Sequence, residues 1–432
     1  MKRAAFHACG LLLVAIALAW AWLAWNPPAP VLSAMLSTGL AWLVFAAAWC
    51  LRSAGGKCAV LIWAIAARLV LVSAPPLFED DHFRYLWDGH RFYEDGTPYA
   101  KAPDAYFESF ESVPEPMQAV LDGINYPHVS TIYPPFCQAA FWTAAAISPG
   151  ALWPWKWIVL AADLLVMLLL AWRFRTRHLL LYAWCPLVLF EIALNAHTDV
   201  LGIAAITGAC LLLRSRRSLW SGAAVGVAIC ARSLAVLPAA FLVARKIRPG
   251  YCLGALVVVA ACYAPFLMRG DGAGMEGMQA MAVSWKFNPL GFTALEALLG
   301  DPMARRLAGI LFMLVAGLSW CLCRWRKWTV SGSVQVAWAA LLLFAPVVNA
   351  WYLLWLFPFV VWCPSFTAFA GMAALTCSWM TGMNLADSSL GLHQLHPSAL
   401  PIQIMMITVG IALDYWTQQR RKSIRMANSS TR

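Results

Sequence analysis

Two adjacent carboxylates, Asp80 and Asp81, follow a long apolar run and open the longest polar segment of the sequence. One of them could remove a proton from an acceptor hydroxyl while its neighbour tunes the pKa by like-charge repulsion. If a helix starts at Asp81, Arg84 and Tyr85 share its face, and Asp88 follows in the same segment. The alternative is structural, because an Asp ahead of a helix caps unpaired backbone N–H groups. Both uses can hold at once.

A second polar group, residues 195–199, ends one apolar run and precedes the next. His197 and Asp199 could ligate a divalent cation or orient a phosphate, although two ligands do not define a metal site. The alternative is a polar cap between two helices. Spacing alone leaves both interpretations open.

Arg232 stands alone in otherwise apolar sequence. An arginine at membrane depth is costly unless it pairs or meets a ligand, and a lipid phosphate is a natural bidentate partner. The alternative is that the side chain snorkels to the membrane surface. Asp163 lies in the middle of an apolar run and is expected to form a structural pair, whereas the role of Arg68 stays open.

These groups must be positioned by membrane helices. Hydrophobic residues make up 62% of the 432 residues, charged residues only 12%, and the mean hydropathy is +0.68. Apolar runs of about 18 to 20 residues, the length that crosses the hydrocarbon core as a helix, recur throughout the chain. The sequence therefore predicts an all-α polytopic membrane protein forming a single domain over residues 1–432.

The net charge of +11 comes largely from basic clusters in short loops, which is typical of cytoplasmic loops rather than of nucleic-acid binding. Thirteen cysteines, without C-x-x-C pairs, behave as small buried hydrophobes and predict no zinc site or disulfide framework. Loop charge then orients the chain, with both termini cytoplasmic and about 13–14 spans.

Segment 75–133 holds eleven acidic and three basic residues, so it is predicted to be an extracytoplasmic loop of short amphipathic helices. Segment 134–149 is a short apolar run. If it crossed the membrane, the next span would place the basic cluster at 173–177 on the outer side, so the segment is interpreted as a helix that does not cross. With that assignment residues 195–199 face the same side as Asp80 and Asp81. A second outer loop covers 268–304, and a basic cytoplasmic tail covers 417–432.

Further motifs lie at predicted outer ends of apolar runs. Ile132-Tyr133-Pro134-Pro135 is typical of a helix start, and Trp351-Tyr352-Leu353-Leu354-Trp355 of an aromatic belt at the membrane interface. In order and spacing, the combined set resembles the GT-C superfamily of polyprenyl-phosphate-sugar-dependent glycosyltransferases, especially its bacterial mannosyltransferase-like branch. The matching residues are Asp80-Asp81-x-x-Arg84-Tyr85-Leu86-Trp87-Asp88-Gly89, Gly96-Thr97-Pro98-Tyr99, Thr131-Ile132-Tyr133-Pro134-Pro135, Asn195-x-His197-x-Asp199, Phe287-Asn288-Pro289 and Trp351–Trp355.

The resemblance implies a GT-C-like helical bundle in a bacterial inner membrane, with its active site on the periplasmic or extracellular side. It implies transfer of a mannose-like hexose from a polyprenyl phosphate to a glycan, lipid or protein acceptor in the cell envelope, with inversion at the anomeric carbon. Asp80 or Asp81 would be the base. No cofactor is certain, and a divalent cation is left open. The substrate-binding residues would be Arg84, Tyr85, Asp88, Tyr133, His197, Asp199, Arg232, Asn288, Trp351 and Tyr352.

Two other functions fit a polytopic protein with acidic loops. A flippase or transporter of lipid-linked glycans would place charges along a path between matched halves, whereas here the polar residues gather in outer loops. A glycan polymerase or ligase would use diphosphate-linked oligosaccharides, and donor competition would separate it from a monophosphate-dependent transferase.

Overall fold

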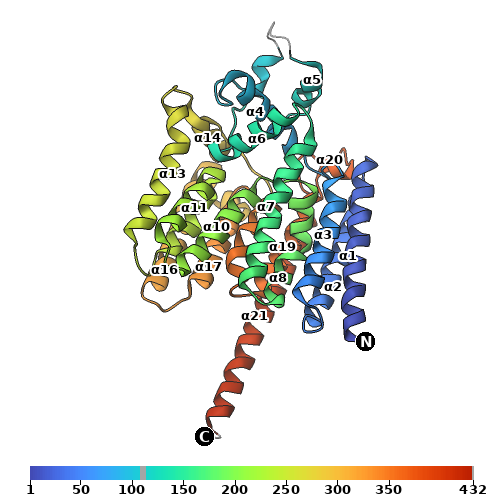
Figure 1. Cartoon of the computed structure of the whole chain (residues 1–432), viewed down its shortest axis with the longest axis vertical. Coiled ribbons are helices and arrows are strands. Elements are labelled where there is room, and N and C mark those ends of the chain that lie inside the picture. Colours follow the sequence, from blue (N-terminus) through green and yellow to red (C-terminus); the bar gives the residue numbers. More distant parts are fainter. Residues whose placement is uncertain (108–112, 431–432) are drawn as a thin grey trace.

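The computed structural model describes residues 1–107 and 113–430, which are predominantly helical (Figure 1). Within these ranges the chain forms 21 α-helices and a few 3₁₀ or π-helical turns, and it contains no strand. Its only extended pairings are two isolated bridges, Phe287 with Val347 and Thr381 with Leu395. The predicted all-α class is confirmed.

The first half of the chain supplies eleven helices, and a π-helical turn, η2 (Leu189–Leu194), follows α9. The helices are α1 (Lys2–Trp25), α2 (Val31–Cys50), α3 (Lys57–Val72), α4 (Asp81–Asp95), α5 (Glu115–Asp122), α6 (Pro135–Ile147), α7 (Leu152–Arg173), α8 (Thr176–Ala183), α9 (Pro186–Val188), α10 (Asp199–Arg214) and α11 (Ser218–Ala231).

The second half supplies the rest, with 3₁₀ turns η3 (Ser233–Ala235), η5 (Ala350–Leu356) and η6 (Leu375–Trp379) between them. The helices are α12 (Val236–Leu242), α13 (Pro249–Leu267), α14 (Met275–Ser284), α15 (Phe292–Leu299), α16 (Asp301–Arg324), α17 (Val330–Phe344), α18 (Phe357–Val360), α19 (Phe366–Ala374), α20 (Gly382–Leu385) and α21 (Ala399–Ser430).

Six helices of the described chain are long and apolar enough to cross a membrane: α1, α2, α7, α13, α16 and residues 399–420 of α21. A seventh span results if α8 and the α9–η2 segment, bent by 45°, count as one. These spans indicate an integral membrane protein. The expected count of about 13–14 is larger because several apolar runs fold into short helices. Helix α11, with 14 residues, is roughly 21 Å long, which is less than the ~30 Å hydrocarbon core.

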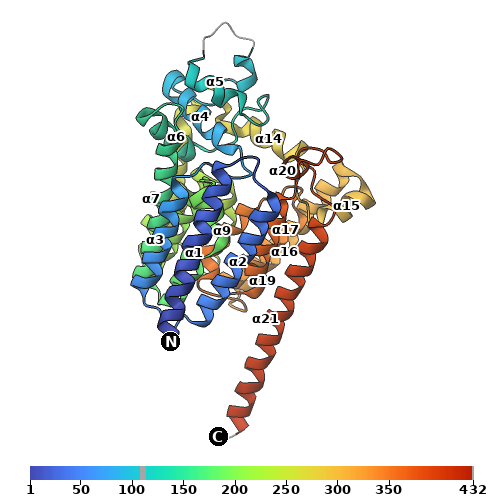
Figure 2. The same cartoon turned by 90° about the vertical axis from the view of Figure 1, so that its right-hand side faces the viewer.

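Both chain termini lie at one end of the helical bundle, and the lower part of α21 projects beyond it (Figures 1 and 2). The basic connections gather there too. Lys57 Nζ donates to Ala171 O at 2.5 Å, and Arg245 Nη2 donates to Trp328 O at 2.8 Å. This common end is the arrangement that the positive-inside rule predicts for cytoplasmic loops.

The segment 75–133 forms α4, a 3₁₀ turn (Pro103–Tyr106) and α5 at the opposite end of the bundle (Figures 1 and 2), while residues 108–112 lie outside the described part. Trp87 of α4 packs with Met117 and Leu121 of α5. Short helices in this segment agree with the expectation from sequence.

Helix α6 packs along α4 at this same end (Figure 2). Its first turn donates the Cys137 thiol to Ala231 O, next to Arg232, at 3.1 Å. Beyond its last turn, Gly150 lies against Pro116 of α5. The first turn of α6 therefore meets the end of α11, and its far end lies against α5.

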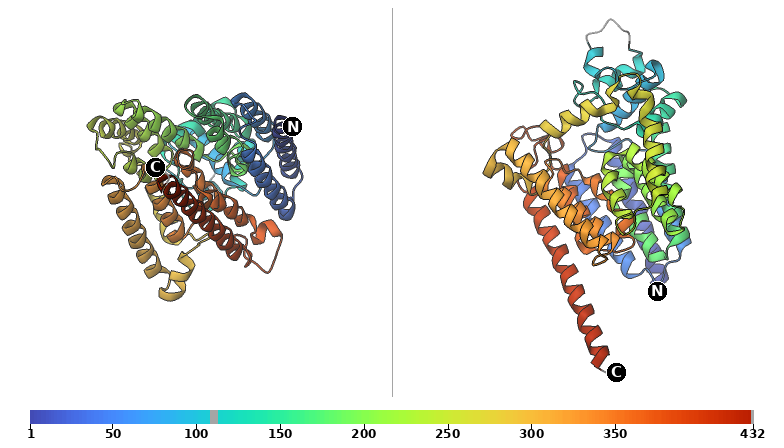
Figure 3. Two further views of the ribbon diagram at one scale, coloured as in Figure 1. Left: turned by 90° about the horizontal axis from the view of Figure 1, so that it is seen from below. Right: turned by 90° about the vertical axis from the view of Figure 1, so that its left-hand side faces the viewer.

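Segment 268–304 contains α14 and α15, and α16 begins within it. Figure 3 shows α14 extending from the upper end of α13 toward α15. Residues 417–430 continue α21 as helix. The two segments predicted as outer loops thus lie at one end of the molecule and the basic tail at the other.

A fully buried ion pair lies in the bundle interior. Arg68 Nε of α3 donates to Asp163 Oδ2 of α7 at 2.6 Å, and both side chains are 0% exposed. Tyr182 donates to Asp163 Oδ1 at 2.7 Å, and Arg68 Nη1 donates to Ala183 O at 2.8 Å. The structural pairing expected for Asp163 is confirmed, and its partner is Arg68.

Candidate functional site

The residues Glu79, Asp80 and Asp81 lie where the chain leaves α3 and enters α4. Asp80 occupies the position before the helix, yet its side chain makes no capping hydrogen bond. Asn125 Nδ2 instead donates to Asp80 Oδ1 at 3.1 Å. The capping alternative therefore does not account for the Asp80 carboxylate, which is turned toward the segment after α5.

The Asp81 carboxylate is held by two phenols. Tyr133 donates to Asp81 Oδ2 at 3.0 Å, and Tyr85, one turn along α4, donates to the same oxygen at 3.3 Å. Tyr85 is buried and stacks on Phe141 with ring centroids 5.0 Å apart. This packing fixes the direction of the phenol, so α6 indirectly sets the orientation of Asp81.

A buried network lies behind these carboxylates. The π-helical turn η2 brings Glu191 within 3.1 Å of His197 Nε2, and Glu79 lies 3.7 Å from the same nitrogen. Asn195 Nδ2 donates to Glu191 at 3.2 Å, while the side-chain oxygen Oδ1 of Asn195 accepts from the Leu77 N–H at 2.9 Å. The chain entering α4 is thereby tied to residues 191–197. Residues 195–199 and the acidic stretch meet, as the topology predicts.

Arg232 follows the last residue of α11 and enters the site from the other side. Its Nε lies 3.8 Å from Asp199 Oδ1, which also accepts from Trp355 Nε1 at 2.6 Å. The guanidinium lies 5.6 Å from the ring centroid of Tyr133 and 6.0 Å from that of Tyr352. Arg232 is 12% exposed, so the snorkelling alternative does not describe it.

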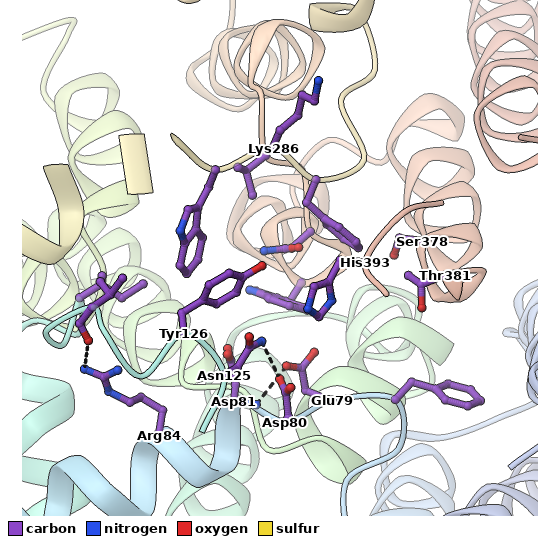
Figure 4. Close-up of a pocket in the computed structure, with 18 of the residues that line it drawn as sticks. Glu79, Asp80, Asp81, Arg84, Asn125, Tyr126, Lys286, Ser378, Thr381 and His393 are labelled. Atoms are coloured by element: carbon purple, nitrogen blue, oxygen red, sulfur yellow. Dashed lines mark hydrogen bonds between the residues drawn. The ribbon is translucent and has the colours of Figure 1, made fainter. Parts of the chain in front are cut away.

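These side chains border a pocket of about 700 Å³ at the α4 end of the bundle (Figure 4). Most of the predicted site residues line it, while the others lie one layer behind. The lining set is Asp80, Asp81, Arg84, Tyr133, Arg232, Trp351 and Tyr352. Tyr85, Asp88, His197, Asp199 and Asn288 do not line it.

Three of those five support the wall in identifiable ways. Asp88 pairs with Arg84 at 2.9 Å and accepts from Gln138 at 3.0 Å, so it anchors α4 to α6. His197 stacks on Trp351 with centroids 3.9 Å apart. Asn288 Nδ2 donates to Val348 O at 3.3 Å, which joins the strand-like segment before α15 to the chain preceding η5. These roles are structural in the geometry observed.

Sequence reasoning assigned no role to the aromatic side of the pocket. Tyr126, Trp285 and His393 come from three distant segments and all line the pocket. Tyr126 and His393 lie above Asp80 and Asn125 (Figure 4). The Tyr126 ring centroid lies 4.7 Å from that of Trp285 and 6.0 Å from that of His393. The pocket therefore has a cationic side at Arg232 and an aromatic side at Tyr126, with the carboxylates between them.

Two lining residues carry strained backbone. Phe78 has φ 61° and Tyr126 has φ 53°, a left-handed conformation that costs a non-glycine residue about 1 kcal/mol or more. Each flanks a carboxylate-bearing segment, because Phe78 precedes Glu79 and Tyr126 follows Asn125. Such strain clusters at functional sites and supports the choice of this pocket.

The electrostatics of the acidic cluster favour bound protons. Burial, followed by the charges of Asp81 and Asp80, raises the pKa of Glu79 well above its usual range. Burial and Asp81 also raise the pKa of Asp80, against the opposing hydrogen bond from Asn125. A carboxylate with a raised pKa takes up a proton more readily near neutral pH, as a general base must.

The acidic cluster also offers ligands for a cation. Glu79, Asp80 and Asp81 each present a carboxylate oxygen, and these atoms all lie within 4.8 Å of one another. Carboxylates are the ligands that Mg²⁺ and Ca²⁺ prefer. His197 and Asp199 are not part of this group, because they pair with Glu191, Trp355 and Arg232 instead.

The fold and pocket together define a helical integral membrane protein with six or seven candidate spans and an acidic pocket at one end. Comparisons with protein-family models, curated proteins and solved structures give no match. The resemblance to a glycosyltransferase superfamily therefore rests on the sequence motifs alone and remains a hypothesis.

Proposed function

We propose that this protein is an inverting membrane glycosyltransferase that moves one mannose-like hexose from a polyprenyl phosphate to an extracytoplasmic acceptor. The observation that carries the proposal is the pairing, across one pocket, of base-type carboxylates with the poorly exposed Arg232. A glycosyl phosphate needs both, since charge develops on the leaving phosphate while the attacking hydroxyl loses its proton.

On this proposal Arg232 binds the lipid phosphate through its guanidinium fork. Tyr133 and Tyr352 flank that fork and limit the positions that it can adopt. The acceptor hydroxyl approaches from the side of Tyr126. Its oxygen bonds to the anomeric carbon as the carbon–oxygen bond to phosphate breaks, and its proton passes to a carboxylate.

Asp80 is the better placed of the two candidate bases. Asp81 Oδ2 already accepts from two phenols, whereas Asp80 accepts from Asn125 and faces the aromatic side. The raised pKa of Asp80 supports the same choice. The acidic cluster could in addition hold a divalent cation against the phosphate.

The proposal places the protein in a bacterial inner membrane, with the pocket on the periplasmic or extracellular face. The support is the gathering of the basic connections at the opposite end of the bundle. The acceptor would be a glycan, a lipid or a protein of the cell envelope.

The test is transfer of radiolabelled sugar by the detergent-purified protein from several polyprenyl-phosphate hexoses, with and without a chelator. We expect Asp80→Asn to lower transfer by about 10²- to 10⁴-fold, which is the usual contribution of a general base. Glu94→Asn, an exposed position on the same helix, is the matched control. Wild-type activity in both Asp80→Asn and Asp81→Asn would refute the assignment.

The two rival functions give distinct results in the same preparation. A flippase reconstituted in vesicles would move the labelled lipid across the bilayer without transferring its sugar. A polymerase or ligase would be inhibited more strongly by diphosphate-linked than by monophosphate-linked lipids. Either result would replace the proposal.

A further inference from the structure

Two cysteines, Cys230 of α11 and Cys262 of α13, face each other near the pocket. Helices α11 and α13 both run from the basic end of the bundle toward the α4 end and lie side by side (Figure 3). Each carries small residues spaced four apart, so the two backbones can approach closely. The contacts of the glycines in α11 show which residues of the two helices lie opposite each other.

The glycine contacts set the register of the two helices. A Cβ atom on Gly222 would lie 2.0 Å from Tyr251 O, and one on Gly226 would lie 2.7 Å from Val258 Cβ. Since both helices run the same way, advancing one further turn of four residues on each places Cys230 opposite Cys262. The two thiols are close enough to interact with each other.

The two thiols differ in accessibility. Cys230 is 0% exposed, whereas Cys262 is partly exposed and lines a second cavity of about 270 Å³. That cavity is mainly apolar, with Phe92, Phe136 and Phe266 in its wall and Arg269 at its edge. A small disulfide-containing molecule can therefore reach Cys262, whereas Cys230 is fully buried and does not line the cavity.

We propose that Cys230 and Cys262 form a thiol–disulfide exchange site, which is oxidised to an intramolecular disulfide by a small aromatic disulfide. The Cys262 thiolate attacks one sulfur of the oxidant and releases its first thiol. Cys230 then attacks Cys262 Sγ, which releases the second thiol and closes the bond. Two protein thiols lose two electrons, the oxidant gains them, and both protons end on the released thiols.

The disulfide would tie the last turn of α11 to α13. Because Arg232 follows Cys230 by two residues, the bond would also fix the backbone from which this pocket arginine extends. The exchange site stands independently of the proposed transferase activity, since it rests on the register and accessibility of the two helices.

The test treats the detergent-purified full-length protein with 4,4′-dithiodipyridine and maps its peptides under non-reducing conditions. We expect a Cys230–Cys262 cross-linked peptide, two hydrogens lighter than the sum of its parts, with no pyridyl adduct left on Cys262. In Cys230→Ser the adduct should persist on Cys262. In Cys262→Ser the buried Cys230 should stay unmodified.

Cys252→Ser, on the same helix at a more exposed position, is the matched control and should give the wild-type cross-link. Cys137 tests the register, because its thiol contacts Ala231 O beside Cys230. A Cys137–Cys230 or Cys137–Cys262 peptide, a lasting pyridyl adduct on wild-type Cys262, or an unreacted Cys262 would each overturn the proposal.

Discussion

Two charged clusters in this protein are both withdrawn from solvent, yet their charges are balanced in opposite ways. In the bundle interior, one cation, Arg68, meets one carboxylate, Asp163, at 2.6 Å, and further hydrogen bonds satisfy both groups. At the α4 end three carboxylates crowd together beside a pocket, and burial, followed by their mutual negative charge, raises the pKa of Glu79 and of Asp80.

The difference separates structural charge from functional charge. In a matched, fully hydrogen-bonded pair the charges are already neutralised within the protein, so the pair does not attract a ligand and serves to join helices. A cluster whose charges oppose one another is held in place by the fold and becomes more stable when a proton or a cation arrives.

The interior pair should be the most sensitive to a single change. Asp163→Ala leaves Arg68 charged and unpaired in the bundle, which typically costs about 3–5 kcal/mol of stability. The measurement is thermal unfolding of the detergent-purified protein. The double variant Arg68→Met with Asp163→Leu should recover most of the loss, because no lone charge is left. An unchanged unfolding temperature in Asp163→Ala would contradict the structural role.

Replacing the pocket arginine, Arg232, should reduce transfer more than it reduces stability. Arg232→Met removes the donor fork facing the pocket and should lower kcat/KM for transfer by about 10²- to 10³-fold. Stability should fall less than in Asp163→Ala, since Arg232 lies 3.8 Å from Asp199 and Asp199 keeps its hydrogen bond from Trp355. Arg232→Lys keeps the charge without the planar fork, so its kcat/KM should lie between those of the wild type and of Arg232→Met. Normal transfer with a large loss of stability would make Arg232 a structural residue like Arg68.

The helical segments were largely predictable from sequence, because apolar runs end at prolines and basic residues. The helix predicted in segment 134–149 is α6 (Pro135–Ile147), and the short helices predicted in segment 75–133 are α4 (Asp81–Asp95) and α5 (Glu115–Asp122). Loop charge also predicted that residues 195–199 and the acidic stretch would lie on the same side. Basic loops mark the cytoplasmic side, and successive spans alternate in direction. Helix length was less predictable, because hydropathy continues through turns such as the one at Arg232.

The aromatic side of the pocket could not be predicted. Tyr126, Trp285 and His393 lie in loops without periodicity, and only the packing of α5, α14 and the segment before α21 brings them together. The role of Asn125 was hidden for the same reason. The partner of Asp163 was equally invisible, because Arg68 and Asp163 are 95 residues apart in the chain.

The raised pKa of Glu79 should make the stability of the folded protein depend on pH. Its pKa in the folded protein is raised above the unfolded value of about 4.3. The stabilising effect of its bound proton is therefore complete below about pH 4.3 and is lost as pH rises through the folded pKa. Glu79→Gln should flatten this decline in unfolding temperature, whereas Glu94→Gln, exposed on α4, should not. A parallel decline in Glu79→Gln would exclude Glu79 as its source.

The smallest effects should tell which aspartate accepts the proton. Asn125→Ala removes the donor to Asp80, and Tyr133→Phe removes one of two donors to Asp81. If Asp80 is the base, Asn125→Ala should lower kcat/KM by roughly tenfold, the equivalent of one hydrogen bond to a charged group. Tyr133→Phe should then cost less, because Tyr85 still orients Asp81. Tyr99→Phe, whose hydroxyl donates only to Tyr133 O among the described contacts, is the control. The opposite order of the two losses would assign the base to Asp81, since a carboxylate that takes the proton is the one whose orientation limits the rate.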